Sequence, residues 1–140
     1  MLGLTQQCDN PPTVELNVFD AKVNGADFRA ASAGWSVDST RTPARFILSS
    51  LDSLGNEILI KVDDLSLGAH TFQLTGGTAE ATYISRQGVF FFGESGAIDI
   101  QELTSERAKG VFFFDAIDIN NSDDPPLVIS QGGFSLGVAE

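Results

Sequence analysis

Residues 19–30 read FDAKVNGADFRA, and apolar and polar side chains alternate on both sides of Asn24-Gly25. This alternation places Phe19, Ala21 and Val23 on one face of an extended chain, because successive side chains of a β-strand point to opposite faces. Asn and Gly both tolerate the positive φ angles that a two-residue hairpin turn requires. The stretch therefore predicts two antiparallel strands joined by a tight turn.

The same alternation recurs along most of the chain, and turn residues interrupt it at spacings typical of strands. Residues 31–43 are small, polar and weakly patterned, which predicts an irregular strand followed by a long loop. Residues 93–96 read GESG, which predicts a turn between one strand at 89–92 and another at 98–100. We expect further strands at 44–51, 57–62, 71–74, 79–83, 109–119 and 127–136.

These runs predict an all-β fold of about nine or ten short strands with no helix. In a chain of 140 residues they fit a single antiparallel β-sandwich or a flattened barrel. Phe occurs 11 times, so large side chains with strong β-propensity are available to build the core. No linker-like composition divides the chain. We therefore predict one domain over 13–140, preceded by a leader over 1–12.

The charge balance excludes some classes of partner. The formal net charge is −11, from 19 acidic and 8 basic residues. A nucleic-acid-binding protein needs a basic stripe for the phosphate backbone, so we expect no nucleic-acid partner. The same balance disfavours electrostatic docking to an anionic membrane. No window has the roughly 18 consecutive apolar residues that a transmembrane helix requires.

Residues 88–92 and 110–114 both read GVFFF, the most unusual local feature of the chain. In a half-buried strand only alternate residues face the core. If Phe112 and Phe114 point inward, Val111 and Phe113 point outward.

The first triplet has two possible orientations, with either Phe91 or the pair Phe90 and Phe92 facing outward. In one interpretation loops cover the outer side of both strands. In the other, an apolar outer patch serves self-association or partner docking. For that patch the predicted interaction residues are Phe91, Val111 and Phe113.

An acidic segment follows the second triplet. Carboxylate and amide oxygens are ligands that Ca²⁺ prefers, so a calcium site is one interpretation. The spacing is not that of an EF-hand, because Ile129 occupies the twelfth position from Asp118. Asx residues before prolines are also ordinary loop chemistry, which favours a solvated loop and no cofactor. The candidate calcium ligands are Asp115, Asp118, Asn120, Asp123 and Asp124.

The sequence offers little for catalysis. His70 and Cys8 are the only residues of their types, and no serine stands in a G-x-S-x-G elbow. Glu94, Asp99 and Glu102 are interpreted as solvated surface rather than as the carboxylate pair of a glycosidase. We expect no enzymatic activity, and a hydrolase built on acidic loops is the remaining alternative.

Several weak motifs follow one another in a fixed order. Residues 19–30 fit F-x-A-K-V-N-G-x-x-F-x-A, and residues 110–116 fit a G-x-F-x-F strand. A polar loop follows, and then a last strand that ends in G-x-F at 132–134. This ordered set resembles a family of small exported lipoprotein domains from Bacteroidota, of uncharacterised function. Intermediate matches lie at 68–74, 81–83 and 96–100.

The resemblance implies an antiparallel β-sandwich, an envelope location, no enzymatic activity and no site residues. It also implies a lipidated cysteine ahead of the domain, a position that Cys8 occupies, although Gln7 departs from the small residue a lipobox prefers. The alternative is an unmodified thiol. Lipidation would hold the protein at the outer membrane or cell surface, with no other membrane contact.

We therefore expect an exported, non-catalytic module that works by protein–protein contact, with another protein or with copies of itself. A glycan- or small-ligand-binding module is the alternative. In it Trp35, the only tryptophan, would stack on a sugar ring. A lone Trp in a β domain is more often a core residue.

Overall fold

The computed structural model describes residues 17–74, 77–121 and 123–137. In these residues the chain forms nine β-strands and no helix, which confirms the all-β prediction. The described part of the chain thus holds no helix of the length and hydrophobicity needed to cross a bilayer. The strands are β2 (Val18–Val23), β3 (Ala26–Asp38), β4 (Arg45–Asp52), β5 (Glu57–Val62), β6 (Gly68–Thr71), β7 (Ala79–Ile84), β8 (Phe90–Leu103), β9 (Ala108–Ile117) and β10 (Leu127–Leu136).

The strands form one antiparallel sheet that closes on itself. Around the ring the order is β8, β7, β5, β4, β3, β2, β10 and β9, and β9 pairs again with β8. Strand β6 pairs with β8 outside this ring. The fold is an eight-stranded antiparallel barrel with one additional strand. The predicted sandwich, which has open sheet edges, is therefore replaced by the other predicted form, a barrel.

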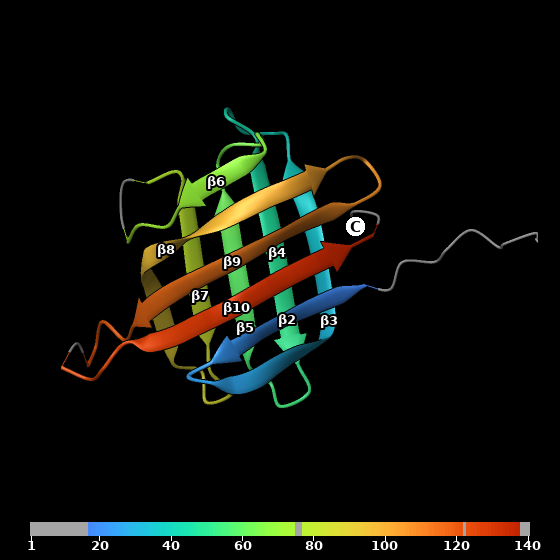
Figure 1. Ribbon diagram of the computed structural model, residues 1–140. Helices are drawn as coiled ribbons and strands as arrows, with labels where there is room; N and C mark the ends of the chain where they lie inside the picture. The colour runs from blue at the N-terminus through green and yellow to red at the C-terminus, as the bar shows by residue number, and fades with distance from the viewer. Residues whose placement is uncertain (1–16, 75–76, 122, 138–140) are drawn as a thin grey trace, which may run out of the picture.

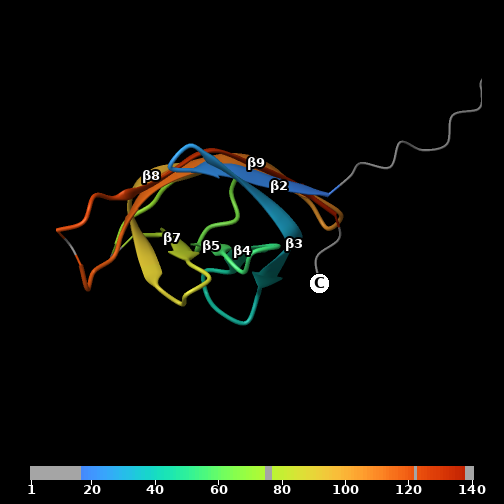
Figure 2. The same cartoon turned by 90° about the horizontal axis from the view of Figure 1, so that it is seen from below.

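The barrel is flattened into two layers. Strands β2, β10, β9 and β8 run obliquely across the front in Figure 1, and β3, β4, β5 and β7 lie behind them. Seen from below, the front layer arches over the other, so its outer face is convex (Figure 2). Both layers turn one face of each strand toward the space between them.

The hairpin predicted at Asn24-Gly25 is present. Asn24 has a φ angle of 49° and Gly25 one of 86°, and Val23 pairs directly with Ala26. The side-chain oxygen Oδ1 of Asn24 also accepts a hydrogen bond from the backbone N–H of Val128 at 2.8 Å. The turn is thus tied to β10, the strand on the other side of β2.

Strand β3 corrects part of the prediction for 31–43: residues 31–38 belong to a long strand, whereas 39–43 lie in the predicted loop before β4. The first part of β3 pairs with β2, and the part from Ala30 to Asp38 pairs with β4 across a bulge. In Figure 2, β3 passes from one layer to the other. The weak alternation arises because a strand that changes layers is not half-buried in one constant environment.

Strand β8 corrects the predicted turn at 93–96. It runs without interruption for 14 residues, with a bulge between Gly93 and Ser95. Gly96 has a φ angle of +120°, and a Cβ atom there would lie 2.2 Å from the carbonyl oxygen of Phe113. The two glycines therefore bend a strand and admit its neighbour, instead of ending the strand. The short strand expected at 71–74 lies earlier, at β6.

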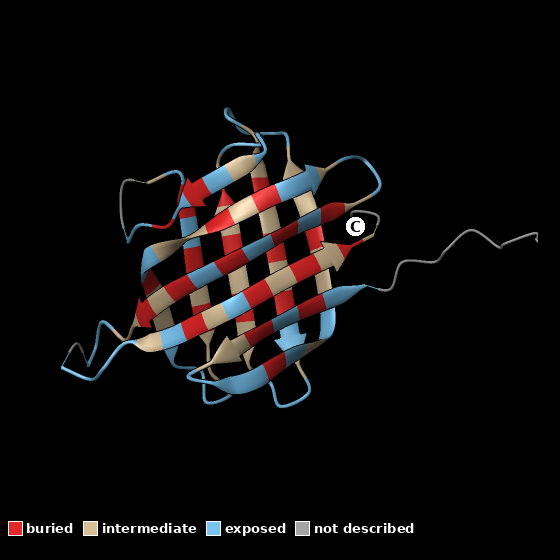
Figure 3. Cartoon of the chain, in the orientation of Figure 1, coloured by how far each residue is buried: buried red, intermediate tan, exposed pale blue. Residues whose placement is uncertain are grey.

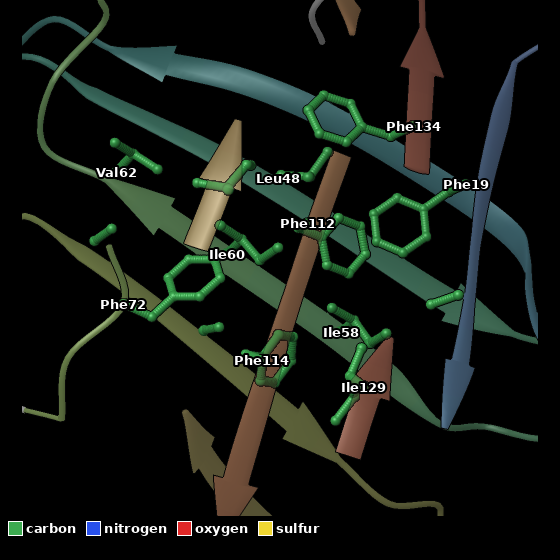
Figure 4. Close-up of a cluster of buried hydrophobic side chains, with 14 of the residues drawn as sticks. Phe19, Leu48, Ile58, Ile60, Val62, Phe72, Phe112, Phe114, Ile129 and Phe134 are labelled. Atoms are coloured by element: carbon green, nitrogen blue, oxygen red, sulfur yellow. The ribbon is translucent and has the colours of Figure 1, made fainter. Parts of the chain in front are cut away.

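The core fills the space between the layers. Burial alternates along most of the strands (Figure 3), and the side chains of β9 meet those of β4 and β5 (Figure 4). Phe112 and Phe114 are 2% and 0% exposed, and the ring of Phe114 packs edge-on against Phe72 at 5.7 Å. Fully buried aliphatic residues opposite them are Leu48, Ile58, Ile60 and Val62.

Candidate functional site

The second Phe triplet presents an exposed aromatic ring on the convex layer. In β9 the buried residues Phe112 and Phe114 alternate with Val111 and Phe113, which are 44% and 57% exposed. Alternation therefore places Phe113 where the sequence predicts it. The same alternation places Lys109 and Asp115 on the outward face, one before Val111 and one after Phe113. We call Lys109, Val111, Phe113 and Asp115 the outer β9 face.

Small side chains lie opposite the two apolar residues of this face at some positions. On β8, Ala97 lies directly opposite Phe113, and Asp99 lies opposite Val111. On β10, Gly133 lies opposite Val111. Directly opposed residues on one face have Cβ atoms about 5 Å apart, so the small Ala97 leaves the β8 side of the Phe113 ring uncovered. On the other side the pairing shifts between Ile129 and Gly132, so no residue of β10 lies directly opposite Phe113. Phe113 therefore stands above its surroundings.

The two charged ends of the outer β9 face form no ion pair among the described residues. Lys109 is exposed and lies across from Glu102 of β8, while Asp115 lies across from Ser95 of β8 and Val128 of β10. Because Phe113 and Val128 both border it, the Asp115 carboxylate stands at the edge of an apolar surface. A partner that covers this surface also covers a charge.

The first Phe triplet corrects one predicted residue. Phe91 is half-buried against the core, and its ring packs edge-on against Tyr83 at 6.0 Å. The outward pair is Phe90 and Phe92, whose rings stack at 6.1 Å. The bulge after Gly93 determines which Phe residues face outward, because its extra residue shifts the inward–outward alternation of the strand by one.

Around this pair the structure shows an apolar group that the sequence analysis missed. Ile84 of β7 pairs with Phe90, and Ile117 of β9 pairs with Phe92. One signal in the sequence indicates it: if Ala81 and Tyr83 face inward, Ile84 faces outward. Leu59 of β5 lies opposite Thr82 and diagonally across from Ile84. We call the group Leu59, Ile84, Phe90, Phe92 and Ile117 the Phe90 patch.

Trp35 is a core residue, which corrects its alternative role in sugar stacking. The side chain is 4% exposed, and its indole N–H donates a hydrogen bond to the carbonyl of Gly137. Its edge contributes to a hollow of about 530 Å³ at one end of the barrel, shared with Val37, Leu65 and Leu103. With its ring packed beside Phe46, Trp35 has no free face for a sugar.

The acidic segment forms a turn held by its own side chains. Asp118 accepts the backbone N–H of Asn120 at 2.9 Å and the side-chain amide of Asn121 at 3.1 Å. Asp115 lies within β9 and not in this turn. In 17–74, 77–121 and 123–137, no three His, Cys, Asp or Glu side chains gather around one point. Calcium binding by Asp115, Asp118, Asn120, Asp123 and Asp124 stays a prediction.

The titratable groups named for catalysis do not converge in the described residues. His70 is buried, and its Nε2 lies 2.8 Å from the carbonyl of Ser66. Glu94, Asp99 and Glu102 are spread along β8. Cys8 and the leader over 1–12 lie outside the residues that the structure describes.

A two-point ion pair lies away from the outer β9 face. Arg45 donates from Nε to Oδ1 of Asp63 at 2.6 Å and from Nη2 to Oδ2 at 3.2 Å. These bonds lower the pKa of the Asp63 carboxyl, against the opposing effect of its partial burial. Both side chains are about one-fifth exposed, so the pair stabilises the turn after β5 and has no free group for chemistry.

Comparisons of this chain with protein-family models, curated proteins and solved structures gave no match. The outer β9 face and the Phe90 patch therefore rest on geometry alone.

Proposed function

We propose that this domain is a non-catalytic module that works by protein–protein contact through the outer β9 face. One observation carries the proposal: Phe113 is 57% exposed near the centre of β9, with the small residue Ala97 opposite it on β8 and no residue of β10 paired directly with it. A polar residue at a solvated strand position has no need of a partner. An exposed aromatic ring, in contrast, is stabilised when a partner covers it. Burial of apolar surface contributes about 25 cal/mol per Å².

The filled interior supports a role in contact and not in catalysis. Within the described residues, the space between the layers is occupied by aromatic and aliphatic side chains, so the barrel has no lumen for a substrate. Active sites are concave and bring a few polar groups together. The outer face of the front layer is convex (Figure 2).

An envelope location is the second part of the proposal. The resemblance to exported lipoprotein domains supports it, and it places a lipid on Cys8. Growth with an alkyne fatty acid should label the protein, and Cys8→Ser should abolish the labelling and release the protein from the membrane fraction. Unlabelled protein in the cytoplasm would remove this part of the proposal and leave the contact surface untouched.

A photo-crosslinking amino acid at position 113 tests the contact function in the cells that make the protein. We expect discrete crosslinked products, because the outer β9 face is covered by a partner. The same amino acid at Leu54, which is 64% exposed on the turn between β4 and β5, is the matched control and should give none. If position 113 gives no more product than position 54, the proposal is wrong.

The hollow at the barrel end supports a second candidate function, the binding of a small apolar ligand. Its wall includes the aliphatic side chains of Val37, Leu65 and Leu103. A screen of lipids tests it, with Leu65→Ser as the variant. Binding that Leu65→Ser does not change would remove this candidate.

A further inference from the structure

The order of side chains along the outer β9 face is complementary to the same order read in reverse. Along the strand it places a base, two apolar residues and an acid: Lys109, Val111, Phe113 and Asp115. When the strand direction is reversed, the same face presents an acid, two apolar residues and a base. A second copy of the strand, turned antiparallel, therefore offers the opposite charge at each end and an apolar residue at each central position.

Two sheets that pack face to face through a two-fold axis have two simple arrangements. An axis along the strands sets every residue against its own copy, which places Asp115 against Asp115 and Lys109 against Lys109. An axis across the strands sets Lys109 against Asp115 of the second copy, and Val111 against Phe113 of the second copy. Like charges in contact are unfavourable, so the antiparallel arrangement is selected.

The neighbouring strands allow this arrangement. The axis across the strands sets Asp99 of β8 against Ala97 of the second copy, because these residues lie opposite Val111 and Phe113 of β9. Glu102 falls opposite Ser95 of the second copy in the same way. Of the carboxylates of β8 and β9 that have a residue paired opposite them, Asp99, Glu102 and Asp115, none is set directly against another, although the chain carries a net charge of −11. Glu94 stands in the bulge beside Ser95 and has no such pairing.

The position of Asp115 indicates what kind of surface must cover this face. If an uncharged partner covered Phe113 and Val128, the neighbouring carboxylate would lose water without gaining a cation, which is unfavourable. The partner must therefore bring a base to Asp115. A second copy brings Lys109, which has no ion pair within the described residues.

We propose that the occupant of the outer β9 face is a second copy of this chain, packed face to face with its β9 strand antiparallel. The inference rests on the proposed contact function and names its partner. Because the front layer is convex (Figure 2), contact is confined to β9 and the strands beside it. Interfaces of this small size are weak, so the dimer forms and dissociates between about 1 µM and about 1 mM protein.

Charge reversal at the two ends of the face tests the arrangement by sedimentation velocity. Lys109→Glu sets two acids together at both ends of the dimer, and Asp115→Lys sets two bases together. Each variant alone should dimerise about tenfold more weakly than the unchanged protein. An equimolar mixture should form a heterodimer with the original affinity, since each Glu at 109 then meets a Lys at 115, and each Lys109 meets an Asp115.

The rescue in the mixture cannot arise within one chain. Six residues of extended strand separate positions 109 and 115 by about 20 Å, a distance at which substitutions act independently. Both variants also keep a large negative net charge, so general attraction between oppositely charged proteins does not explain a heterodimer. The double variant Lys109→Glu/Asp115→Lys should dimerise like the unchanged protein, which provides an internal check.

Two results would overturn the inference: a strict monomer at about 1 mM, or a dimer that neither charge reversal weakens. The crosslinking experiment then separates it from the proposed function. Products at position 113 that contain a different protein would retain the contact function and reject the self-complementary pairing. The absence of products at position 113 would reject both.

Discussion

Gly132 and Gly133 are consecutive residues of β10 with opposite surroundings. A Cβ atom on Gly132 would lie 2.5–2.6 Å from three ring carbons of Phe112, whereas on Gly133 its nearest neighbour would be 4.0 Å away. Phe112 cannot give way, because the rings of Phe19 and Phe134 pack against it at 5.3 Å and 6.5 Å. At Gly132 the missing side chain is therefore part of the core.

Alanine at the two positions should have different effects on stability. We expect Gly132→Ala to lower the free energy of unfolding by about 2–3 kcal/mol through overpacking. Gly133→Ala, the matched control one residue away, should change it by less than about 0.5 kcal/mol. Urea denaturation measures both. Equal losses in the two variants would contradict the tight packing on Phe112.

The Asp63 carboxyl makes the free energy of unfolding depend on pH. Its pKa is lowered in the folded chain by the hydrogen bonds from Arg45, so the pair stabilises the fold above the unfolded pKa of about 4. That contribution is lost as the pH falls through the lowered pKa of the folded state. Asp63→Asn should lower the free energy of unfolding by about 1 kcal/mol at pH 7. The difference should shrink steadily below pH 4.

The control for this prediction is Asp123→Asn, in the exposed loop before β10, which should stay within about 0.5 kcal/mol of the unchanged protein. Chemical denaturation between pH 3 and pH 7 gives the comparison. A loss in Asp63→Asn that persists undiminished at pH 3 would show that the carboxylate is not the stabilising form.

At the scale of single strands, alternation decides which Phe belongs to which surface. In β9 the run Phe112, Phe114 and Ala116 fixes the inward face, and the sequence shows it because both ends of the strand continue the pattern. In β8 the run of three Phe residues has no such continuation. The bulge at Gly93 and Ser95 decides its orientation, and a bulge has the same glycine signal as a turn.

Neighbouring Phe residues of β9 should therefore differ in what they contribute. Phe114→Ala leaves a cavity beside Phe72 and should cost about 3–5 kcal/mol of unfolding free energy. Phe113→Ala removes an exposed ring and should cost less than about 0.5 kcal/mol in dilute protein. Thermal or urea denaturation at low concentration checks both. A large loss in Phe113→Ala would mean that its ring supports the fold and not a contact.

At the scale of the whole molecule, the sequence did not predict which strands pair to close the barrel. The hairpin at Asn24-Gly25 and the all-β class depend on residues close together in the chain, and both were predicted. Closure depends on β9 meeting β8 and on β10 meeting β2, and the second of these pairs joins residues about a hundred positions apart. No local pattern encodes such a pairing. Val111 and Phe113 of the outer β9 face were predicted, and the Phe90 patch was not, because its members come from β5, β7, β8 and β9.

Since every described strand belongs to one sheet, the barrel should unfold as a unit. Fluorescence of Trp35, which bridges β3 to Gly137 through its indole N–H, reports packing, and circular dichroism reports the strands. We expect the two signals to change together along a urea titration. Separate transitions would show that one layer can persist without the other.

The pairing of β2 with β10 also has a consequence for how the protein is made. A ribosome releases the amino-terminal end first, so β2, β3, β4 and β5 emerge long before β9 and β10 exist. Until then Phe19, Phe46 and Leu48, all buried in the finished barrel, have no opposite layer to cover them. Folding of the barrel therefore awaits the synthesis of β9 and β10, and until then the nascent chain stays available to chaperones or to machinery that handles unfolded polypeptides.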